Sequence, residues 1–376
     1  MGRSEFGQYH HSGYNFTFGY LEILNEIDLR PHIWFSNDPV ANTRRYISLY
    51  DGVASVVRKN HPTIKFVGNC LAGRGDQDNG VVWRTFLNQS EHRPGTPWPP
   101  EAVSWHMYAV MAHGKPWSEW PSYLVAQARG YLPACEFVSK LIKQLSPTTM
   151  IFADEIGICN SCGGPIAEMN APSLLGMGGN TSWWNLHSAI YAMWHGELSA
   201  AGVDMLGASQ FVGYPSAAYS GNGIQPFEGD ADATGNCFDM TMVDWTTGAG
   251  NARWWTLKML NDAMGFELKH PLPSTVQLTT DVYARGFRPA GGTRFPGPTN
   301  HTIVIASLVN TTRQVFVPDA KGGAPIWMVA HRQAGYDYVP YSMGSTDPSG
   351  SIAIPPFAVA VVFVLPGRCP SGQPLQ

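Results

Sequence analysis

The segment Tyr20–Asp28 reads Tyr-Leu-Glu-Ile-Leu-Asn-Glu-Ile-Asp, a short apolar run that ends in polar residues. Similar runs recur at intervals of roughly 40 to 50 residues, and stretches with helical periodicity lie between them. This alternation is typical of successive βα units, which build a parallel sheet. The predicted strands are Tyr20–Asn25, Ile64–Asn69, Ala102–Tyr108, Met150–Glu155 and Val203–Gln210.

The first intervening helix has the clearest signals. Asp38 can cap it, Pro39 suits its first position, and apolar residues recur at helical spacing after them. This apolar stripe consists of Ile47, Tyr50, Val53, Ala54 and Val57. Further helices are predicted over Tyr123–Leu145, with a break at Pro133, over Trp183–Ala200 and over Gly250–Met264.

After Pro271 the pattern changes to short alternating runs, which predict a small antiparallel β domain. Two stretches rich in Gly, Pro, Ser and Thr, Arg285–Asn300 and Tyr341–Ser351, are predicted to be loops. We therefore expect one domain over residues 1–270 and a second over 271–376. The predicted strands of the second domain are Val276–Tyr283, Thr302–Val309, Gln314–Val317, Ile326–Ala330 and Ala358–Leu365.

Composition excludes some classes of function. The chain has 376 residues, of which 44% are hydrophobic and 14% charged, so it can bury a large core. Its formal net charge is −4, and it has no run of lysine or arginine to bind a nucleic acid backbone. No uninterrupted apolar run is long enough for a membrane span. The sequence leaves protein partners unknown.

Cysteines and glycosylation sequons bear on the compartment. The six cysteines permit disulfides, and five Asn-x-Ser/Thr sequons begin at Asn15, Asn88, Asn180, Asn300 and Asn310. Together they favour a secreted or lysosome-like location, although the sequence shows no leader peptide. Cys159-Asn-Ser-Cys162 has redox or zinc spacing without a second pair of ligands, so we expect a loop disulfide or two free thiols.

Polar residues end several of the predicted strands. In a parallel βα architecture these positions face the functional site. Two glutamates, Glu26 and Glu155, end different strands, and such a pair can cleave a glycosidic bond when one donates a proton and the other attacks the anomeric carbon. The other polar residues at strand ends are Asn25, His106, Tyr108, Ser209 and Gln210.

These motifs resemble those of the clan A glycoside hydrolases. The likeness lies in Asn25-Glu26, in His106-x-Tyr108 on the second strand after it, and in Glu155 on the next. Arg45-Tyr46 and Leu49-Tyr50-Asp51 on the first helix, followed by His61-Pro62-Thr63-Ile64, are similar to the branch with β-xylosidases and α-L-iduronidases.

The resemblance implies an α/β fold, a (β/α)8-type TIM barrel, of which this chain lacks about the first three βα units. Residues 1–270 would then hold strands four to eight of the barrel, and residues 271–376 a β-sandwich. The truncation makes the activity of the chain itself an open question.

The resemblance also implies roles for single residues. Glu26 is the expected acid/base, Glu155 the nucleophile, and Asn25 a hydrogen-bond partner of the neighbouring sugar hydroxyl. Tyr108 would orient Glu155, and His106 would line the sugar subsite. The expected substrate is a β-linked or iduronide-like terminal sugar, and neither a cofactor nor a metal is expected.

Two positions depart from the pattern of many relatives, which have Pro and Trp where this chain has Ile27 and Gln210. Gln210 is nevertheless expected to contact the substrate. The stacking surface that the tryptophan forms in relatives could come from a loop aromatic: Trp183, Trp184, Tyr214 or Trp245.

Two other functions stay open at this stage. The chain could be a catalytically inactive carbohydrate-binding or truncated remnant that retains the glutamates. It could also be a barrel enzyme that uses His106 and nearby acids to hold a metal.

Overall fold

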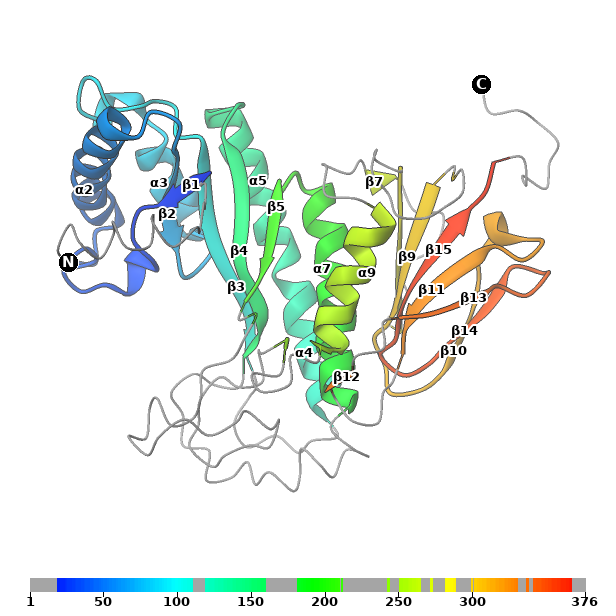
Figure 1. Cartoon of the computed structure of the whole chain (residues 1–376). Helices are drawn as coiled ribbons and strands as arrows, with labels where there is room; N and C mark the ends of the chain where they lie inside the picture. The colour runs from blue at the N-terminus through cyan, green and yellow to red at the C-terminus, as the bar shows by residue number, and fades with distance from the viewer. Residues whose placement is uncertain are drawn as a thin grey trace. The chain divides into compact units, whose positions relative to one another are not determined.

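A computed structural model describes residues 19–110, 119–159, 181–209, 211, 242–243, 250–264, 271–272, 281–288, 299, 301–330, 336–337 and 341–366. Five strands form one sheet in the order β1-β2-β3-β4-β5 (Figure 1), with β1–β2 and β2–β3 pairing in parallel. All five predicted strands are confirmed, as is the α/β class. Their bounds are Tyr20–Glu22, Lys65–Leu71, Ala102–Val110, Met150–Cys159 and Met205–Ala208.

The first strand is shorter than predicted. β1 ends at Glu22, whereas the apolar pattern predicted that it would continue to Asn25. Leu24 and Glu26 have left-handed φ angles of 67° and 52°, which extended backbone excludes. Asn25 and Glu26 therefore lie in a bend that follows the strand.

The helices follow the sequence signals closely. α2 spans Pro39–Asn60, and the Asp38 carboxylate accepts from the backbone N–H groups of Val40 and Ala41 at 2.9 and 3.2 Å. The predicted break near Pro133 separates α4 (Trp120–Gly130) from α5 (Leu132–Leu145), because proline fits the first turn of a new helix. The remaining predicted helices are α7 (Thr181–Ala200) and α9 (Ala252–Met264).

The chain divides into two compact units, the first comprising Met1–His106 and Leu141–Phe152. In this unit an aromatic cluster of Tyr46, Tyr50, Phe66 and Phe86, none of them exposed, fills the core. The unit also contains η1 (Ile27–Leu29), α3 (Gln77–Phe86) and η2 (Gln89–Glu91).

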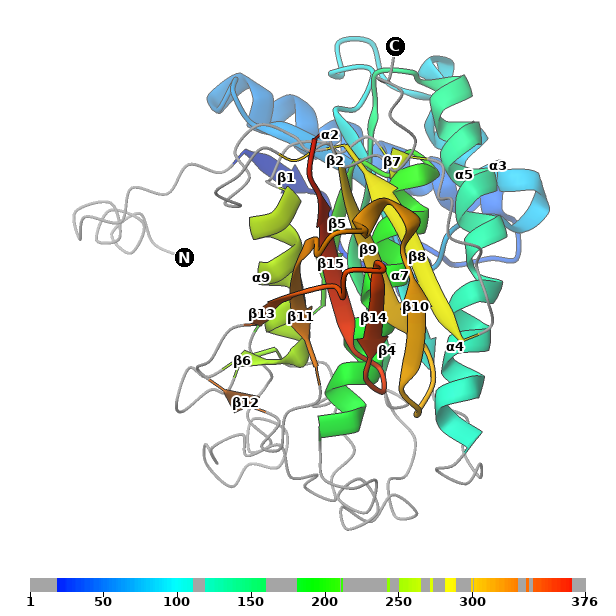
Figure 2. The ribbon, with the colours of Figure 1, turned by 90° about the vertical axis from the view of Figure 1, so that its right-hand side faces the viewer.

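The second unit comprises Met107–Lys140 and Ala153–Gln376, and a six-stranded sheet in the order β13-β11-β15-β9-β8-β7 lies within it. Its described neighbours pair antiparallel, and β10 and β14 form a second antiparallel pair (Figure 2). Buried residues of both sets of strands form one apolar core. The strands are β7 (Pro271–Leu272), β8 (Val282–Phe287), β9 (His301–Ser307), β10 (Arg313–Phe316), β11 (Pro325–Val329), β13 (Ser342–Ser345), β14 (Ser351–Ile354) and β15 (Val359–Val364). A short antiparallel bridge joins β6 (Gly250–Asn251) to β12 (Tyr336–Asp337), and η6 spans Pro318–Ala320.

The antiparallel strands predicted after Pro271 are confirmed, but both loop predictions were partly wrong. β13 lies inside the predicted loop Tyr341–Ser351, and its residues Ser-Met-Gly-Ser are all exposed, so they show no apolar alternation. β8 continues to Phe287, into the predicted loop that begins at Arg285. The start of the predicted strand Val276–Tyr283 lies outside the described residues.

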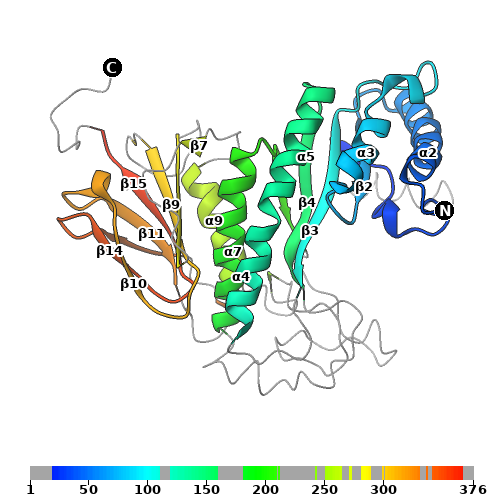
Figure 3. The same cartoon turned by 180° about the vertical axis from the view of Figure 1, so that it is seen from behind.

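Helices α7 and α9 lie side by side next to the six-stranded sheet (Figure 3). Arg285 of β8 pairs with Glu197 of α7 at 2.6 Å, and the Tyr341 hydroxyl donates to Asp262 of α9 at 3.0 Å. The domain boundary near residue 270 and the sandwich interpretation stay predictions. Within the described part of the chain, no helix combines the length and the apolar character that crossing a membrane requires.

Candidate active site

Glu26 lies in the bend after β1, directly before η1. Its carboxylate Oε1 lies 3.3 Å from Nδ1 of His106, and its Oε2 lies 3.7 Å from Nη2 of Arg30. The His106 side chain is 1% exposed, whereas that of Glu26 is 25% exposed. Glu26 is thus a partly accessible carboxylate with a buried imidazole partner, which suits a group that exchanges protons with a ligand.

Asn25 is exposed, and its backbone carbonyl accepts a hydrogen bond from Nε of Arg30 at 2.9 Å. Arg30 thereby contacts both Asn25 and Glu26, and the contacts stabilise the bend that carries them. The predicted role of the Asn25 side chain toward a sugar hydroxyl stays a prediction.

Glu155 lies within β4. The Tyr108 hydroxyl donates to Oε2 of Glu155 at 2.7 Å, a short hydrogen bond of the kind that charge assistance produces. The sequence-based expectation that Tyr108 orients Glu155 agrees with this contact. The bond fixes the orientation of the carboxylate, as a nucleophile requires.

A second hydroxyl completes this arrangement. Oγ of Ser209, a residue 6% exposed, lies 2.7 Å from the Tyr108 hydroxyl oxygen. Tyrosine has a single hydroxyl hydrogen, so when Tyr108 donates to Glu155, Ser209 donates to Tyr108. A hydrogen-bonded chain therefore runs from the Ser209 hydroxyl through the Tyr108 hydroxyl to the Glu155 carboxylate.

Backbone contacts hold Ser209 in place. Its N–H donates to the Ile156 carbonyl at 2.9 Å, and its carbonyl accepts from Nη2 of Arg253, a residue 5% exposed, at 3.1 Å. The sequence identifies Ser209 only as a polar strand end and gives no signal for Arg253, because α9 brings this arginine in from more than 40 positions away.

Gly207 of β5 allows a close approach to β4. A Cβ atom at this position would lie 2.5 Å from the backbone oxygen of Asp154. No side chain fits against a backbone carbonyl at this distance, so glycine permits the strand pairing next to Glu155.

Two buried titratable groups that interact with Arg253, His187 and Tyr191, have shifted pKa values. Burial lowers the pKa of His187 well below its ordinary value, and the positive charge of Arg253 lowers it further. Burial also raises the pKa of Tyr191, although the charge of Arg253 opposes this shift. Both groups are therefore neutral at neutral pH.

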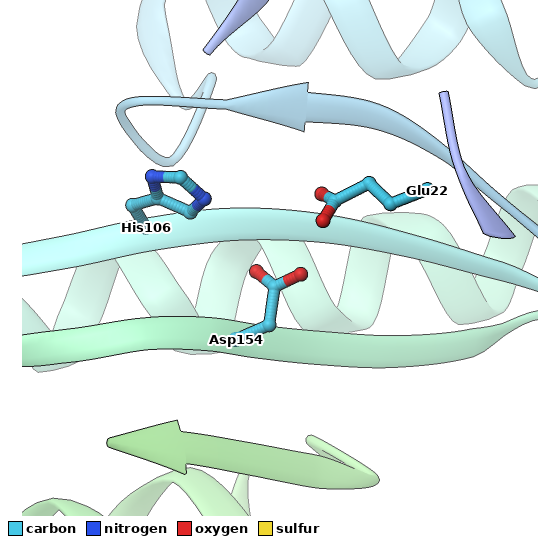
Figure 4. Close-up of side chains that lie close together, drawn as sticks. All are labelled: Glu22, His106 and Asp154. Carbon is cyan, nitrogen blue, oxygen red and sulfur yellow. The ribbon is translucent and has the colours of Figure 1, made fainter. Parts of the chain in front are cut away.

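Glu22 is a site residue that the sequence-based prediction missed. Its Oε1 accepts from the Ser104 hydroxyl at 2.6 Å, and its ligand atoms lie within 4.8 Å of those of His106. Figure 4 shows the Glu22 carboxylate and the His106 ring on the same side of β3; it also draws Asp154 on β4. The sequence signal that could have identified Glu22 is its charge within an otherwise apolar strand.

Asp28 makes a hydrogen bond to the backbone that follows β2. Its carboxylate accepts from the backbone N–H of Ala72 at 2.7 Å, and burial raises its pKa. Gln210 lies outside the described residues, so its predicted contact with the substrate stays a prediction. The predicted Cys159–Cys162 pairing also lies outside them.

Of the loop aromatics considered as a stacking surface, Trp184 is buried in α7 with 5% exposed, which leaves no ring face for a sugar. Tyr214, Trp245 and the Trp183 side chain lie outside the described residues.

In the first unit, the ligand atoms of Glu22 and of Glu26 each lie within 4.8 Å of those of His106, and carboxylates and imidazole form sites for zinc or iron(II). The same atoms also make hydrogen bonds, from Ser104 to Glu22 and between His106 and Glu26. These protein contacts account for their placement without an ion, and the metal-dependent function stays a prediction.

No protein-family model matches the sequence, and no curated protein matches it. Solved structures do resemble it. The GH51 arabinofuranosidase from Xanthomonas axonopodis pv. citri has a TM-score of 0.55 at 12% identity, with 96% of this chain and 70% of that chain covered. The GH51 α-L-arabinofuranosidase from Thermotoga petrophila RKU-1 has a TM-score of 0.56 at 12% identity, with the same coverage. A Paenibacillus polymyxa xyloglucanase of glycoside hydrolase family 44 has a TM-score of 0.53 at 10% identity, with 92% and 65% covered. At these identities the likeness shows the fold alone: the chain shares its fold with glycoside hydrolases.

Proposed function

We propose that this protein is a retaining glycoside hydrolase, with Glu26 as general acid/base and Glu155 as nucleophile. One observation carries the proposal: a single strand, β3, supplies a partner to each glutamate. His106 contacts Glu26 at 3.3 Å, and Tyr108 contacts Glu155 at 2.7 Å.

His106 and Tyr108 are two residues apart on β3, and alternate side chains of a strand project from the same face. At a rise of about 3.3 Å per residue their Cα atoms are about 7 Å apart along the strand. Glutamates held by these two side chains are therefore expected on one face of the sheet. Retaining enzymes need carboxyl groups about 5 to 5.5 Å apart, so the proposal requires this separation between Glu26 and Glu155.

The two environments suit different roles. Glu155 accepts a short hydrogen bond that fixes the orientation of its carboxylate, as an attacking group needs. Glu26 is partly exposed and has longer contacts, so it can be protonated to assist departure and deprotonated to activate water. The reaction forms a bond from a Glu155 oxygen to the anomeric carbon while the glycosidic bond breaks and its oxygen takes the Glu26 proton. Water then releases the sugar, and Glu26 regains a proton.

The three solved structures named above are glycosidases, which supports a carbohydrate substrate. We assign Asn25, His106, Tyr108 and Gln210 to contacts with the sugar. The specific sugar is left to experiment, with β-linked and iduronide-like terminal sugars as the first candidates.

The test is covalent trapping with 2-deoxy-2-fluoro glycosides that carry a dinitrophenolate leaving group, offered as a panel of arabinofuranosyl, xylosyl, glucosyl and uronosyl forms. Intact mass spectrometry should show the addition of one sugar, and peptide mapping should place it on Glu155. Glu155→Gln should take no label, whereas Glu26→Gln should still be labelled, because an activated leaving group needs little acid assistance.

Label on another residue would overturn the assignment of Glu155. If the panel gives neither label nor turnover while the folded chain still binds oligosaccharides, the protein is a carbohydrate-binding remnant rather than a hydrolase.

We further propose that the protein is secreted or resides in a lysosome-like compartment. Of the five sequons, those at Asn88 and Asn310 lie on exposed described residues, where an oligosaccharyl transferase could reach them. A mobility shift after enzymatic removal of N-glycans from the protein purified from its native source would test this.

A further inference from the structure

A cavity of about 460 Å³ lies in the first unit, between the chain that follows β1 and the chain that follows β2. Small-molecule sites typically have 300 to 1,000 Å³. Trp34 contributes an aromatic side chain to the wall, and polar side chains come from both segments. The polar side chains of the lining include Asp28, Asn37, Arg74, Asp76, Gln77 and Asp78.

A buried asparagine fixes the first wall. Asn42, which is 0% exposed, accepts through Oδ1 from the backbone N–H groups of Phe35 and Ser36, both at 3.2 Å. Its Nδ2 donates to the Ser36 carbonyl at 2.8 Å. These three bonds hold the segment that carries Trp34 and Asn37, so this wall is formed before a ligand arrives.

The second wall is fixed in the same manner. The Asp28 carboxylate accepts from Ala72 N–H at 2.7 Å, and the Trp83 indole donates to the Arg74 carbonyl at 2.8 Å. Gly75 has a φ of 63°, and a Cβ there would lie 2.6 Å from a methyl carbon of Leu71. Glycine is thus needed for the turn that places Arg74 and Asp76 in the wall.

The charge of the lining selects among ligands. Three carboxylates, from Asp28, Asp76 and Asp78, and one guanidinium, from Arg74, give a formal charge of −2. Nε of Arg74 lies 3.5 Å from Asp76, so the single cation is already next to an anion. A carboxylated or sulfated ligand would meet net repulsion, whereas hydroxyl and ammonium groups can donate to these carboxylates.

We propose that this pocket binds a neutral or cationic sugar residue on the leaving-group side of the glycosidic bond. The proposal rests on the function proposed above: Glu26 protonates the leaving oxygen, and Asp28 of the pocket follows it by two residues. Trp34 offers its ring to the sugar face, while Asn37, Gln77 and Asp78 bond to hydroxyl or amino groups.

The experiment measures binding by saturation-transfer NMR on the full-length chain, which needs no turnover. The probes are xylobiose, the disaccharide of glucosamine, and a disaccharide that contains glucuronic acid. The first two should bind, and the acidic probe should bind at least about tenfold more weakly, a difference of roughly 1.4 kcal/mol.

Trp34→Ala should weaken the binding of xylobiose at least about tenfold, as expected when an aromatic contact is removed from a pocket. Phe35→Ala is the matched control: this neighbouring side chain is 55% exposed and does not line the cavity. Asp78→Asn changes an exposed residue and retains its size, so folding should be unaffected; it should weaken the cationic probe about threefold relative to xylobiose.

Equal or tighter binding of the acidic probe, or binding that is insensitive to both Trp34→Ala and Asp78→Asn, would overturn the pocket proposal. Binding that depends on Trp34 in a chain that fails the covalent trapping would support the pocket and refute the hydrolase. Trapping on Glu155, together with binding that does not depend on Trp34, would support the hydrolase and refute the pocket.

Discussion

The surroundings of the two proposed catalytic glutamates differ in how firmly they hold their carboxylate. Glu26 lies in a bend with left-handed backbone and has side-chain contacts of 3.3 and 3.7 Å, one of them to an exposed arginine. Glu155 lies inside a strand and accepts a bond of 2.7 Å from Tyr108, which Ser209 supports from behind. Glu26 is thus held by longer contacts than the hydrogen bond that Glu155 accepts from Tyr108.

This difference matches the demands of a double displacement. The nucleophile has one task, attack along a defined line, and misplacement by about 1 Å can cost a hundredfold in rate. The acid/base must give up its proton in one step and recover it in the next, so contacts that strongly favoured one form would slow the other step. The contrast between the two surroundings therefore supports the proposed roles of Glu26 and Glu155.

Replacement of either carboxylate by an amide should give the largest and most distinct effects. Glu155→Gln should reduce kcat/KM by about 10⁴-fold or more for every leaving group, since no other group forms the intermediate. Steady-state kinetics with a series of aryl glycosides would measure this. Activity above about 1% of wild type in this variant would contradict the assignment.

Glu26→Gln is the matched variant in the same series. It should lose about 10² to 10⁴-fold with a poor leaving group but far less with dinitrophenolate, the dependence expected of a missing acid. Added azide should restore turnover by attacking the intermediate in place of activated water. If both variants respond alike to the leaving group, the contrast between the two environments has no catalytic meaning.

Loss of the Tyr108 hydroxyl should have the next largest effect. Tyr108→Phe removes the hydrogen bond to Glu155 at 2.7 Å, and bonds to charged groups are worth about 1.5 to 3 kcal/mol. We expect kcat to fall about 10- to 100-fold with little change in KM. Tyr131→Phe, which removes a bond to Gln127 at 3.2 Å on α4, is the matched control and should leave kcat unchanged.

Ser209→Ala tests the hydrogen bond between Ser209 and Tyr108. Ser209 contacts Tyr108 rather than the carboxylate, so its loss should cost about 0.5 to 1.5 kcal/mol, or roughly 2- to 10-fold in kcat. In the Tyr108→Phe background the same change should have little further effect, because both act through one bond. Additive effects in this double-mutant cycle would show that Ser209 acts by another route.

The sequence predicted much of this region because strand ends and spacing are local properties. The spacing of His106 and Tyr108 by two residues already indicates a shared strand face, and the apolar runs indicate the strand that carries Glu155 and the strand that precedes Glu26. Local patterns do not report which distant groups meet. The contact from Arg253 to Ser209 spans 44 positions, and no periodicity encodes it.

The sequence did not predict α3 or the pocket beside it, because their residues do not follow the usual helical pattern. In the first turn of α3, Asp78, Asn79 and Gly80 have φ angles of 49°, 57° and 69°, which are not helical, and their sequence gave no helix signal. The pocket beside it depends on Asn42, which holds the opposite wall from within α2. Only the folded chain brings these segments together.

The smallest predicted effect concerns acid stability behind Glu155. His187 is buried and its pKa lies well below the ordinary value, so the folded state keeps it neutral while the unfolded state gains a proton as pH falls below 6.5. Its contribution to stability is therefore present above pH 6.5 and is lost as pH decreases toward the folded-state pKa, by about 1.4 kcal/mol per pH unit. Denaturant titrations at pH 7.5 and 5.5 should show this loss in the wild type and a smaller one in His187→Gln.

His61→Gln, at an exposed position, should retain the wild-type pH dependence and serves as the control. If His187→Gln also retains it, protonation near Arg253 does not govern the region. If the dependence disappears in His187→Gln, protonation of His187, which the charge of Arg253 opposes, determines the acid stability of the folded chain.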